Sequence, residues 1–321
     1  MRPRILVAGL VALALSVTAC AVPQRKDTDI VTKPGASSAS ARSVVAEYSA
    51  VRQRADESLD GSLLADIEGG DLLAIDQGAY FVTVRVDIPG SYQGVQLQPP
   101  EQVFAPRFAE YPLWFVVVAH DPVRDTKRVA VFERTDSVSP WLMTMGPESS
   151  AEAALPPVLR DRTGAAVAVG PEDDSKTGVT PTEVLQRYAE ALGPQSAAGA
   201  SFAPDAFLAQ THRFQRTQQR LEFATFTQEW TAEAPDFALR CRGGGVLLFG
   251  TLTRADSYTV ETDSFIDWED NAEAAAYLPG RVYRTATLDY THQVLMFVPP
   301  VGEGQPRLIG QYGGVVDGHG S

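Results

Sequence analysis

Two stretches of the chain carry apolar residues at the spacing of an amphipathic helix. In the first stretch these residues are Val44, Val45, Tyr48, Val51 and Ala55. In the second they are Val184, Leu185, Tyr188 and Leu192. Because residues three and four positions apart share one face of a helix, each stretch predicts a helix with one buried side. Thr180 and Pro181 predict where the second of these helices begins.

A similar order of elements follows each predicted helix. A further helix is expected around residues 63–65, and its counterpart around residues 207–209. Apolar alternation then predicts strands at matching places in the two halves of the chain. The expected strands are 80–86, 113–121, 129–132 and 140–143 in the first half, and 221–226, 282–289, 294–297 and 306–309 in the second. Short helices are expected at 101–108 and 272–278, and an additional strand at 246–252.

This repeated order predicts an α+β protein in which helices cover one face of an antiparallel sheet. We expect two cone-shaped domains, at residues 43–146 and 180–321. The segment 147–179 is rich in Ala, Pro, Gly, Glu and Asp and is interpreted as the linker between them. Leu159 and residues 165–169 leave open the alternative that this segment completes the first sheet.

The N-terminus has the pattern of a secretory leader. A basic start precedes an apolar run over residues 5–17, which is shorter than the ~20 residues of a membrane-spanning helix. Val17-Thr18-Ala19-Cys20 follows, and it resembles the lipobox of bacterial lipoproteins, in which the cysteine receives a diacylglyceryl group before cleavage. The resemblance implies that residues 1–19 are a signal peptide and that Cys20 is lipidated. A plain secretory signal with an incidental cysteine is the alternative.

Residues 20–42 are interpreted as the lipidated cysteine and a flexible tether. They are small or polar for the most part and show no apolar periodicity. Two or more acyl chains attach a protein to a bilayer more stably than one. We therefore expect a lipid-anchored protein on the extracytoplasmic face of a bacterial cell membrane.

Composition narrows the classes of function. Apolar residues make up 44% of the 321 residues, which is enough to bury a core. The net charge of −13, from 27 basic and 40 acidic residues, disfavours nucleic acid as a partner. The 2 cysteines and 4 histidines form neither a disulfide framework nor a metal-ligand spacing. No cofactor and no metal site are expected.

The order of elements resembles the NTF2-like superfamily, in which a curved sheet wraps around helices and leaves a conical pocket. Together, the lipobox, the tether and the tandem arrangement resemble uncharacterised lipoproteins that are common in actinobacteria. The resemblance covers residues 43–316 and rests on element order and internal similarity. The NTF2-like fold hosts enzymes, carriers and scaffolds, so it implies an architecture and does not imply a role.

Two groups of residues are candidates for chemistry in such a cone. His120-Asp121 and Asp289-Tyr290-Thr291-His292 are expected at strand ends, where they would share one rim of the sheets. The alternative is that these residues are ordinary strand-end turns. Ketosteroid isomerase-like members of the superfamily use buried carboxylates with a tyrosine, and the resemblance suggests Asp76 with Tyr80 or Tyr48 for these parts. Asp76-Gln77-Gly78 also has the pattern of a helix end.

The remaining polar and aromatic motifs favour structural roles. Cys241 lies between two arginines, which would activate an exposed thiol, but a structural thiol is the expected alternative. Gly243-Gly244-Gly245 precedes a strand and lacks the rest of a phosphate loop, so it predicts a hairpin turn or bulge. The acidic runs 172–174 and 263–270 lack the pattern of an EF-hand and are interpreted as solvated loops. The four tryptophans are expected to pack on the sheets: Trp114, Trp141, Trp230 and Trp268.

From the sequence we expect a binding or scaffold module of the cell envelope, with no catalytic residue assigned. Its partners are expected to be the membrane, through the lipid, and an envelope protein or an apolar small molecule. The alternatives are a carrier of an apolar ligand and an isomerase or hydrolase working in one conical pocket. Filled cones would favour the scaffold, an apolar cavity the carrier, and converging acids and histidines the enzyme.

Overall fold

Helix α1 (Ser38–Ser58) begins where the Ser37 side chain accepts a hydrogen bond from the Ser40 amide, 3.1 Å away. The computed structural model describes residues 32–86, 92–194, 196–268 and 271–321. Within it, Thr32–Ser321 form one compact unit. The predicted helix over residues 44–55 is confirmed, but the expected tether boundary at residue 42 is wrong. The helix starts earlier because Ser37 caps it and Ala41 is already buried.

Helices α2 (Gly61–Leu64) and α3 (Gly70–Val86) follow, and α3 corrects two expectations. Residues 80–86, expected as a strand, form the last turns of α3. Their apolar alternation is also compatible with a helix, and packing of Tyr80 against Ala55 and Leu64 decides between the two. Asp76-Gln77-Gly78 lies inside α3 instead of ending it. A Cβ on Gly78 would lie 2.3 Å from the Val315 carbonyl oxygen, so glycine permits a close approach of strand β12.

The first half also contains short and long strands, of which β1 precedes α1 and the others follow α3. They are β1 (Lys33–Pro34), β2 (Gln102–Phe104), β3 (Arg107–Phe108), β4 (Leu113–Asp121), β5 (Thr126–Arg134), β6 (Leu142–Met145) and β7 (Glu148–Ser150). The predicted strand 113–121 is confirmed. The short helix expected at 101–108 is wrong, because Pro106 cannot donate a helical hydrogen bond and the flanking residues pair as β2 and β3 instead.

The second half is built from helices followed by long strands. Its elements are α4 (Pro181–Leu192), η1 (Ala197–Ser201), α5 (Ala206–Gln218), β8 (Ala224–Ala232), β9 (Phe237–Arg240), η2 (Arg242–Gly244), β10 (Val246–Val260), α6 (Ala272–Tyr277), β11 (Thr285–Val298) and β12 (Arg307–Gly320). Thr180 and Glu183 cap α4 reciprocally, which confirms its predicted start. The strands expected at 282–289 and 294–297 are parts of the single strand β11.

One antiparallel sheet runs through both halves of the chain. Its strand order is β2-β4-β5-β7-β12-β11-β10-β8, and β7 joins the halves by pairing with β12 between Glu148 and Gln311. The expected linker 147–179 therefore contributes a strand to the sheet, and bridges at Val158 and Ala168 attach it to β9 and the turn that follows. The expected α+β class with an antiparallel sheet is confirmed at this level. Assignment of the halves to two NTF2-like domains stays a prediction.

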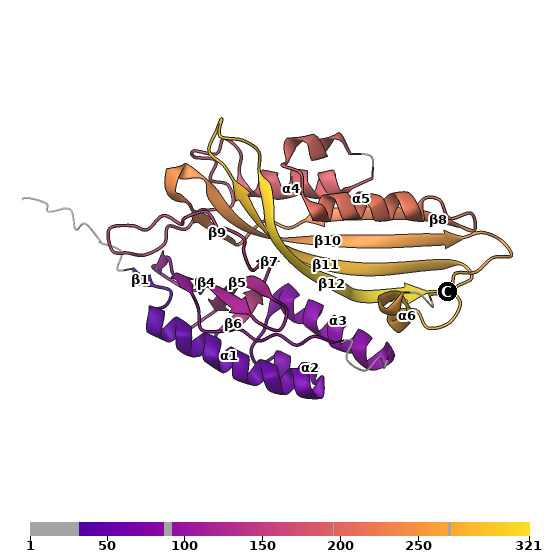
Figure 1. Ribbon diagram of the computed structural model, residues 1–321, viewed down its shortest axis with the longest axis horizontal. Coiled ribbons are helices and arrows are strands. Elements are labelled where there is room, and N and C mark those ends of the chain that lie inside the picture. Colours follow the sequence, from indigo (N-terminus) through magenta and orange to yellow (C-terminus); the bar gives the residue numbers. More distant parts are fainter. Residues whose placement is uncertain (1–31, 87–91, 195, 269–270) are drawn as a thin grey trace, which may run out of the picture. The chain divides into compact units, whose positions relative to one another are not determined.

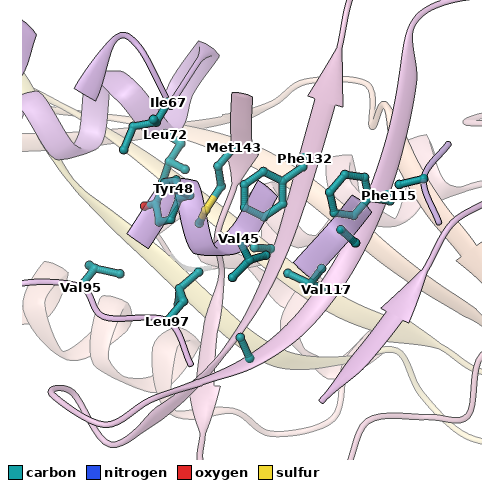
Figure 2. Close-up of a cluster of buried hydrophobic side chains, with 14 of the residues drawn as sticks. Val45, Tyr48, Ile67, Leu72, Val95, Leu97, Phe115, Val117, Phe132 and Met143 are labelled. Carbon is teal, nitrogen blue, oxygen red and sulfur yellow. The ribbon is translucent and has the colours of Figure 1, made fainter. Parts of the chain in front are cut away.

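The buried side chains show why the halves form one unit. Helices α1 and α3 pack on β4 and β5 around Tyr48, Phe115 and Phe132 (Figure 2). Helix α4 covers β10 and β11, and Figure 1 shows α4 and α5 beside these long strands. A third cluster combines Val116 and Val131 of the first half with strand residues of the second. Shared apolar burial of this kind stabilises both halves together.

Candidate functional site

The centre of the first half is a charged group that the apolar clusters surround. Arg52, on the buried face of α1, has no exposed surface. Its Nε is 2.8 Å from Asp56, and its Nη1 is 2.5 Å from both Glu68 and Asp76. Its Nη2 donates to the Tyr92 hydroxyl at 2.7 Å. A buried guanidinium is tolerated in this way only because carboxylates and a hydroxyl replace water around it.

Helical spacing aligns the tyrosines that complete this arrangement. Tyr48 precedes Arg52 by one turn of α1 and donates to Glu68 at 2.7 Å. Tyr80 follows Asp76 by one turn of α3 and donates to Asp56 at 2.5 Å. The sequence-suggested trio of Asp76, Tyr48 and Tyr80 is thus brought to one place. Arg52 mediates their association, and both tyrosine hydroxyls bind carboxylates other than Asp76.

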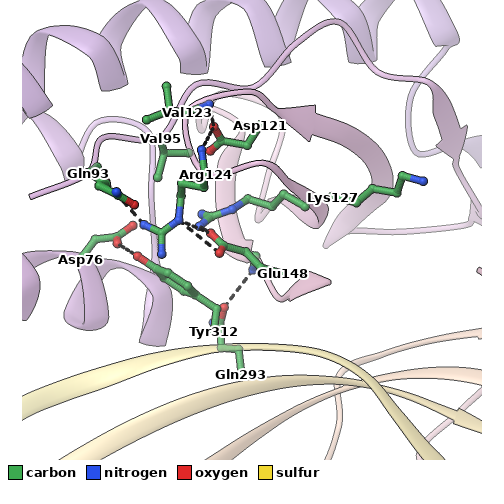
Figure 3. A network of polar contacts seen from close by, with 12 residues as sticks. Asp76, Gln93, Val95, Asp121, Val123, Arg124, Lys127, Glu148, Gln293 and Tyr312 are labelled. Carbon is green, nitrogen blue, oxygen red and sulfur yellow. Dashed lines mark hydrogen bonds and ion pairs between the residues drawn. The ribbon is translucent and has the colours of Figure 1, made fainter. Parts of the chain in front are cut away.

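Strand β12 adds a partner from the far end of the chain. The Tyr312 hydroxyl donates to Asp76. The guanidinium of Arg128 lies 4.4 Å from the centre of the Tyr312 ring and pairs with Glu148. Arg124 also pairs with Glu148, at 3.1 Å, and Figure 3 shows it between Gln93 and the Tyr312 ring. We call Arg52, Glu68, Asp76, Arg128 and Tyr312, with the groups that bind them, the buried polar network.

Burial and charge separate the two carboxyl groups that flank Arg52. Burial, together with the neighbouring Asp76 carboxylate, raises the pKa of Glu68 to about 8. Burial also opposes ionisation of Asp76, but the charge and hydrogen bond of Arg52 outweigh it and lower the pKa of Asp76. At neutral pH the pair therefore consists of a protonated Glu68 and an ionised Asp76. The Oε2 atom of Glu68 is buried without a hydrogen-bond partner among the described residues.

A cleft of about 340 Å³ adjoins this network. One wall is the face of α3 that carries Ile75, Ala79 and Val82, and the opposite wall is β12 from Tyr312 to Val315. Tyr92, Gln93, Arg124, Thr83 and Glu273 supply its polar lining. Its volume is at the lower end of the range of small-molecule sites.

The second half contains a different buried group, centred on His292 of β11. The imidazole is 7% exposed and packs against the rings of Phe207, Trp230 and Tyr290. Burial, and then the nearby Arg254 charge, lower its pKa to about 3. Neither ring nitrogen has a hydrogen-bond partner among the described residues. His292 is therefore a neutral ring in an aromatic core.

Comparison with known proteins places the chain in a family. The profile of a domain of unknown function, DUF8094, matches residues 32–320. The chain belongs to the DUF8094 family. An uncharacterised lipoprotein of Streptomyces coelicolor is 24% identical over 323 residues, which span 98% of this chain and 94% of that protein. No solved structure matches the chain.

In this DUF8094 member, the two strand-end motifs do not share a rim, so that expectation is wrong. Asp121 ends β4 and accepts hydrogen bonds from the amides of Val123 and Arg124, as a turn former does. His120 lies 3.4 Å from Asp125 in the same hairpin. Asp289 and His292 lie inside β11 and pair with β10, because the strand continues to residue 298.

The other sequence motifs have structural roles. Burial raises the pKa of Cys241 to about 11, which opposes the reactive thiol and favours the structural one. The three glycines form the turn from β9 to β10, as predicted. Trp114 and Trp268 are core residues, and Trp141 and Trp230 pack against the cores.

Cys20, the expected lipidation site, lies outside the described residues. Within the part of the chain that the structure describes, no helix combines the length and hydropathy needed to cross a bilayer. Over the same residues, no group of three or more His, Cys, Asp or Glu is placed to hold a metal ion.

Arg52, the cation at the centre of the buried polar network, was not identified from the sequence. Arg52 stands one turn after Tyr48 on the apolar face of the predicted helix, and a charge at such a position signals a buried ion pair. Arg128 gives a similar signal, because it stands two and four positions before the apolar Ala130 and Phe132 and so shares their face of β5. Tyr312 gives no local signal, since its partner Asp76 is 236 residues away.

Proposed function

We propose that the protein is a lipid-anchored component of the bacterial cell envelope that acts by binding, as a scaffold or adaptor, rather than by catalysis. The supporting observation is that the interior of the first half is occupied by a network whose charged groups bind one another. Each nitrogen of Arg52 has a protein partner. A scaffold requires this kind of preorganised body, whose surface is held in one arrangement.

The isomerase alternative requires an available carboxylate with a tyrosine donor beside a substrate. Asp76 instead forms an ion pair with Arg52 at 2.5 Å and accepts from Tyr312, and both partners are buried. Tyr48 donates to Glu68. A group that already has internal partners must give them up before it can act on a substrate, which disfavours catalysis at this position.

The histidine of the second half is also a poor general base. A base with a pKa of about 3 is far from the pH at which an envelope enzyme works, and proton transfer is most effective when the two are close. Phe207 and Trp230 pack directly on the ring. These observations support an interior of the second half that is filled by its own side chains. A partner would then bind at the protein's surface and not in a conical pocket.

Envelope anchoring is supported by the leader and by the relative from Streptomyces. The relative is named as a lipoprotein, and its alignment spans 98% of this chain, which includes the residues around Cys20. The lipobox-like Val17-Thr18-Ala19-Cys20 supplies the acceptor cysteine. Acyl chains on Cys20 would keep the body beside the bilayer and therefore beside other envelope proteins.

Cross-linking in cells that express the full-length chain tests this proposal. Wild type and Tyr48→Phe should recover the same envelope protein, and that protein used as bait should recover the chain. Cys20→Ser should lose the partner if anchoring brings the two together. Failure of reciprocal recovery from wild-type cells would contradict the binding role. A second result would also contradict it: that the wild-type protein, incubated with a cell extract, consumes a small molecule that Tyr48→Phe leaves unchanged.

A further inference from the structure

The cleft between α3 and β12 combines one cationic group with an apolar wall. Arg124 is the cation, and its side chain is 27% exposed. Among the described residues, its Nε pairs with Glu148 and its Nη1 reaches the Gln93 carbonyl oxygen at 3.5 Å. Glu148 is shared with Arg128, so two guanidinium groups face one carboxylate. The end of the cleft beside Tyr312, where Arg124 lies, therefore has cationic character, while Glu273 lines another part of it.

The apolar wall runs away from this cation along α3. Ile75, Ala79 and Val82 lie on one helix face, and the helical rise places Val82 ~10 Å beyond Ile75. Ile75 directly precedes Asp76, the carboxylate to which Tyr312 donates, so it is the residue of this wall nearest the polar end of the cleft. A ligand lying along α3 would thus have its polar end at Arg124 and an apolar part against the helix.

One glycine on β12 leaves room for such a ligand. Gly313 and Gly314 both line the cleft, and neighbouring strand residues point to opposite faces of the sheet. A Cβ on Gly314 would meet only Ile75 within 4 Å, at 4.0 Å, whereas a Cβ on Gly313 would lie 2.4 Å from the His292 ring. The position of Gly314 thus opens on the cleft, and a side chain added there would enter it.

The geometry points to this cleft as a binding site for an amphipathic monocarboxylate, with Arg124 at its carboxylate and Ile75, Ala79 and Val82 along its apolar chain. The assignment rests on the proposed binding function and names a ligand class for it. A guanidinium binds a planar carboxylate with two parallel hydrogen bonds.

Neighbouring charges favour a single negative charge on the ligand. Glu148 neutralises part of the charge of Arg124, and Glu273 also lines the cleft. A phosphate dianion would be repelled by both carboxyl groups more strongly than a carboxylate would. A cationic amphiphile would be repelled by the positive charge of Arg124.

Octanoate is a suitable probe, because its chain is about as long as the ~10 Å of helix between Ile75 and Val82. The acylated full-length protein in lipid nanodiscs is titrated with octanoate by saturation-transfer NMR, and empty nanodiscs give the background. Octanoate should bind the wild type, and octanol and octylammonium should bind at least about tenfold more weakly. Gly314→Ala should keep the affinity, since its Cβ makes an ordinary contact, whereas Gly314→Leu should fill the cleft and lose about tenfold or more.

Arg124→Gln should weaken octanoate binding about tenfold and leave octanol binding unchanged, because only the carboxylate contact is lost. Circular dichroism checks that this variant folds, and Gly314→Leu tests the site without touching an ion pair. Equal binding of octanoate and octanol, tighter binding of octylammonium, or unchanged affinity in Gly314→Leu would overturn the assignment. If the cross-linked partner is recovered while octanoate fails to bind, the cleft assignment alone is wrong. Octanoate binding without a recovered partner contradicts the scaffold role alone.

Discussion

The hydroxyl of Tyr312 donates a buried hydrogen bond to the carboxylate of Asp76, 236 residues earlier in the chain. This contact ties the C-terminal strand β12 to helix α3. Asp76 in turn binds Arg52, so three elements meet at one carboxylate: α1, α3 and β12. Because a buried charge needs every partner it has, the network makes the packing of α1 and α3 against β12 specific.

Tyr312→Phe tests this contact directly. The ring remains beside Arg128, but Asp76 loses a hydrogen bond to its charge, which should lower the free energy of unfolding by about 1.5–3 kcal/mol. Urea denaturation of both proteins measures the difference. Tyr283→Phe is the matched control, since Tyr283 is 58% exposed and should change stability by less than about 0.5 kcal/mol. Equal stability of wild type and Tyr312→Phe would show that the bond contributes nothing.

Arg52→Leu should be the most damaging single change in the network. It leaves the carboxyl groups of Asp76 and Glu68 buried without their cation, and loss of one partner of a buried pair costs about 3–5 kcal/mol. Arg54→Leu is the control on the same helix, because Arg54 is exposed. Arg54→Leu should stay within about 0.5 kcal/mol of wild type. Similar losses in the two variants would contradict a special role for Arg52.

Glu68 should make the protein less stable as the pH rises towards 8. Its folded pKa of about 8 exceeds the ordinary value of 4.5, so the folded state holds a proton that the unfolded state has released. The free energy of unfolding should therefore fall by roughly 1–2 kcal/mol between pH 6.5 and 8. Glu68→Gln keeps an uncharged group of the same shape and should flatten this slope. A slope that persists in Glu68→Gln would assign it to other groups.

His292 should produce the opposite dependence at acid pH. Its folded pKa of about 3 lies below the ordinary value of 6.5, so the unfolded state takes up a proton first as the pH falls. The stability that the neutral ring provides is complete above pH 6.5 and is lost towards pH 3, at roughly 1.4 kcal/mol per pH unit. His292→Leu should remove this loss, whereas the exposed His319→Leu should retain it. Parallel stability curves for wild type and His292→Leu would contradict the buried neutral ring.

Much of the fold could be predicted from local pattern, where burial on one face leaves a period in the sequence. The helix at residues 44–55, strand 113–121 and the capped start of α4 are such cases. The strand predicted at residues 80–86 was wrong, because tertiary packing of Tyr80 outweighed the strand-like alternation of apolar residues. Strand β12 extends to Gly320, well beyond the expected residues 306–309.

Glycines hid the length of β12, because they weaken the strand pattern for a tertiary reason. A Cβ on Gly318 would lie 2.7 Å from Tyr277, and glycine there allows α6 to approach. The candidate site shows the same limit. Asp76, Tyr48 and Tyr80 were named from a resemblance, but their true partners depend on contacts between distant elements, such as Arg52 with Glu68 and Tyr312 with Asp76.

The mass of the mature N-terminus tests the envelope-anchor claim most directly. Full-length protein is expressed with its leader, purified from the membrane fraction and analysed by intact-mass and N-terminal peptide spectrometry. The account predicts a chain that begins at Cys20 and carries a diacylglyceryl group, with Cys20→Ser released from the membrane fraction. A chain that retains residues 1–19, or that begins with an unmodified Cys20 thiol, would contradict it.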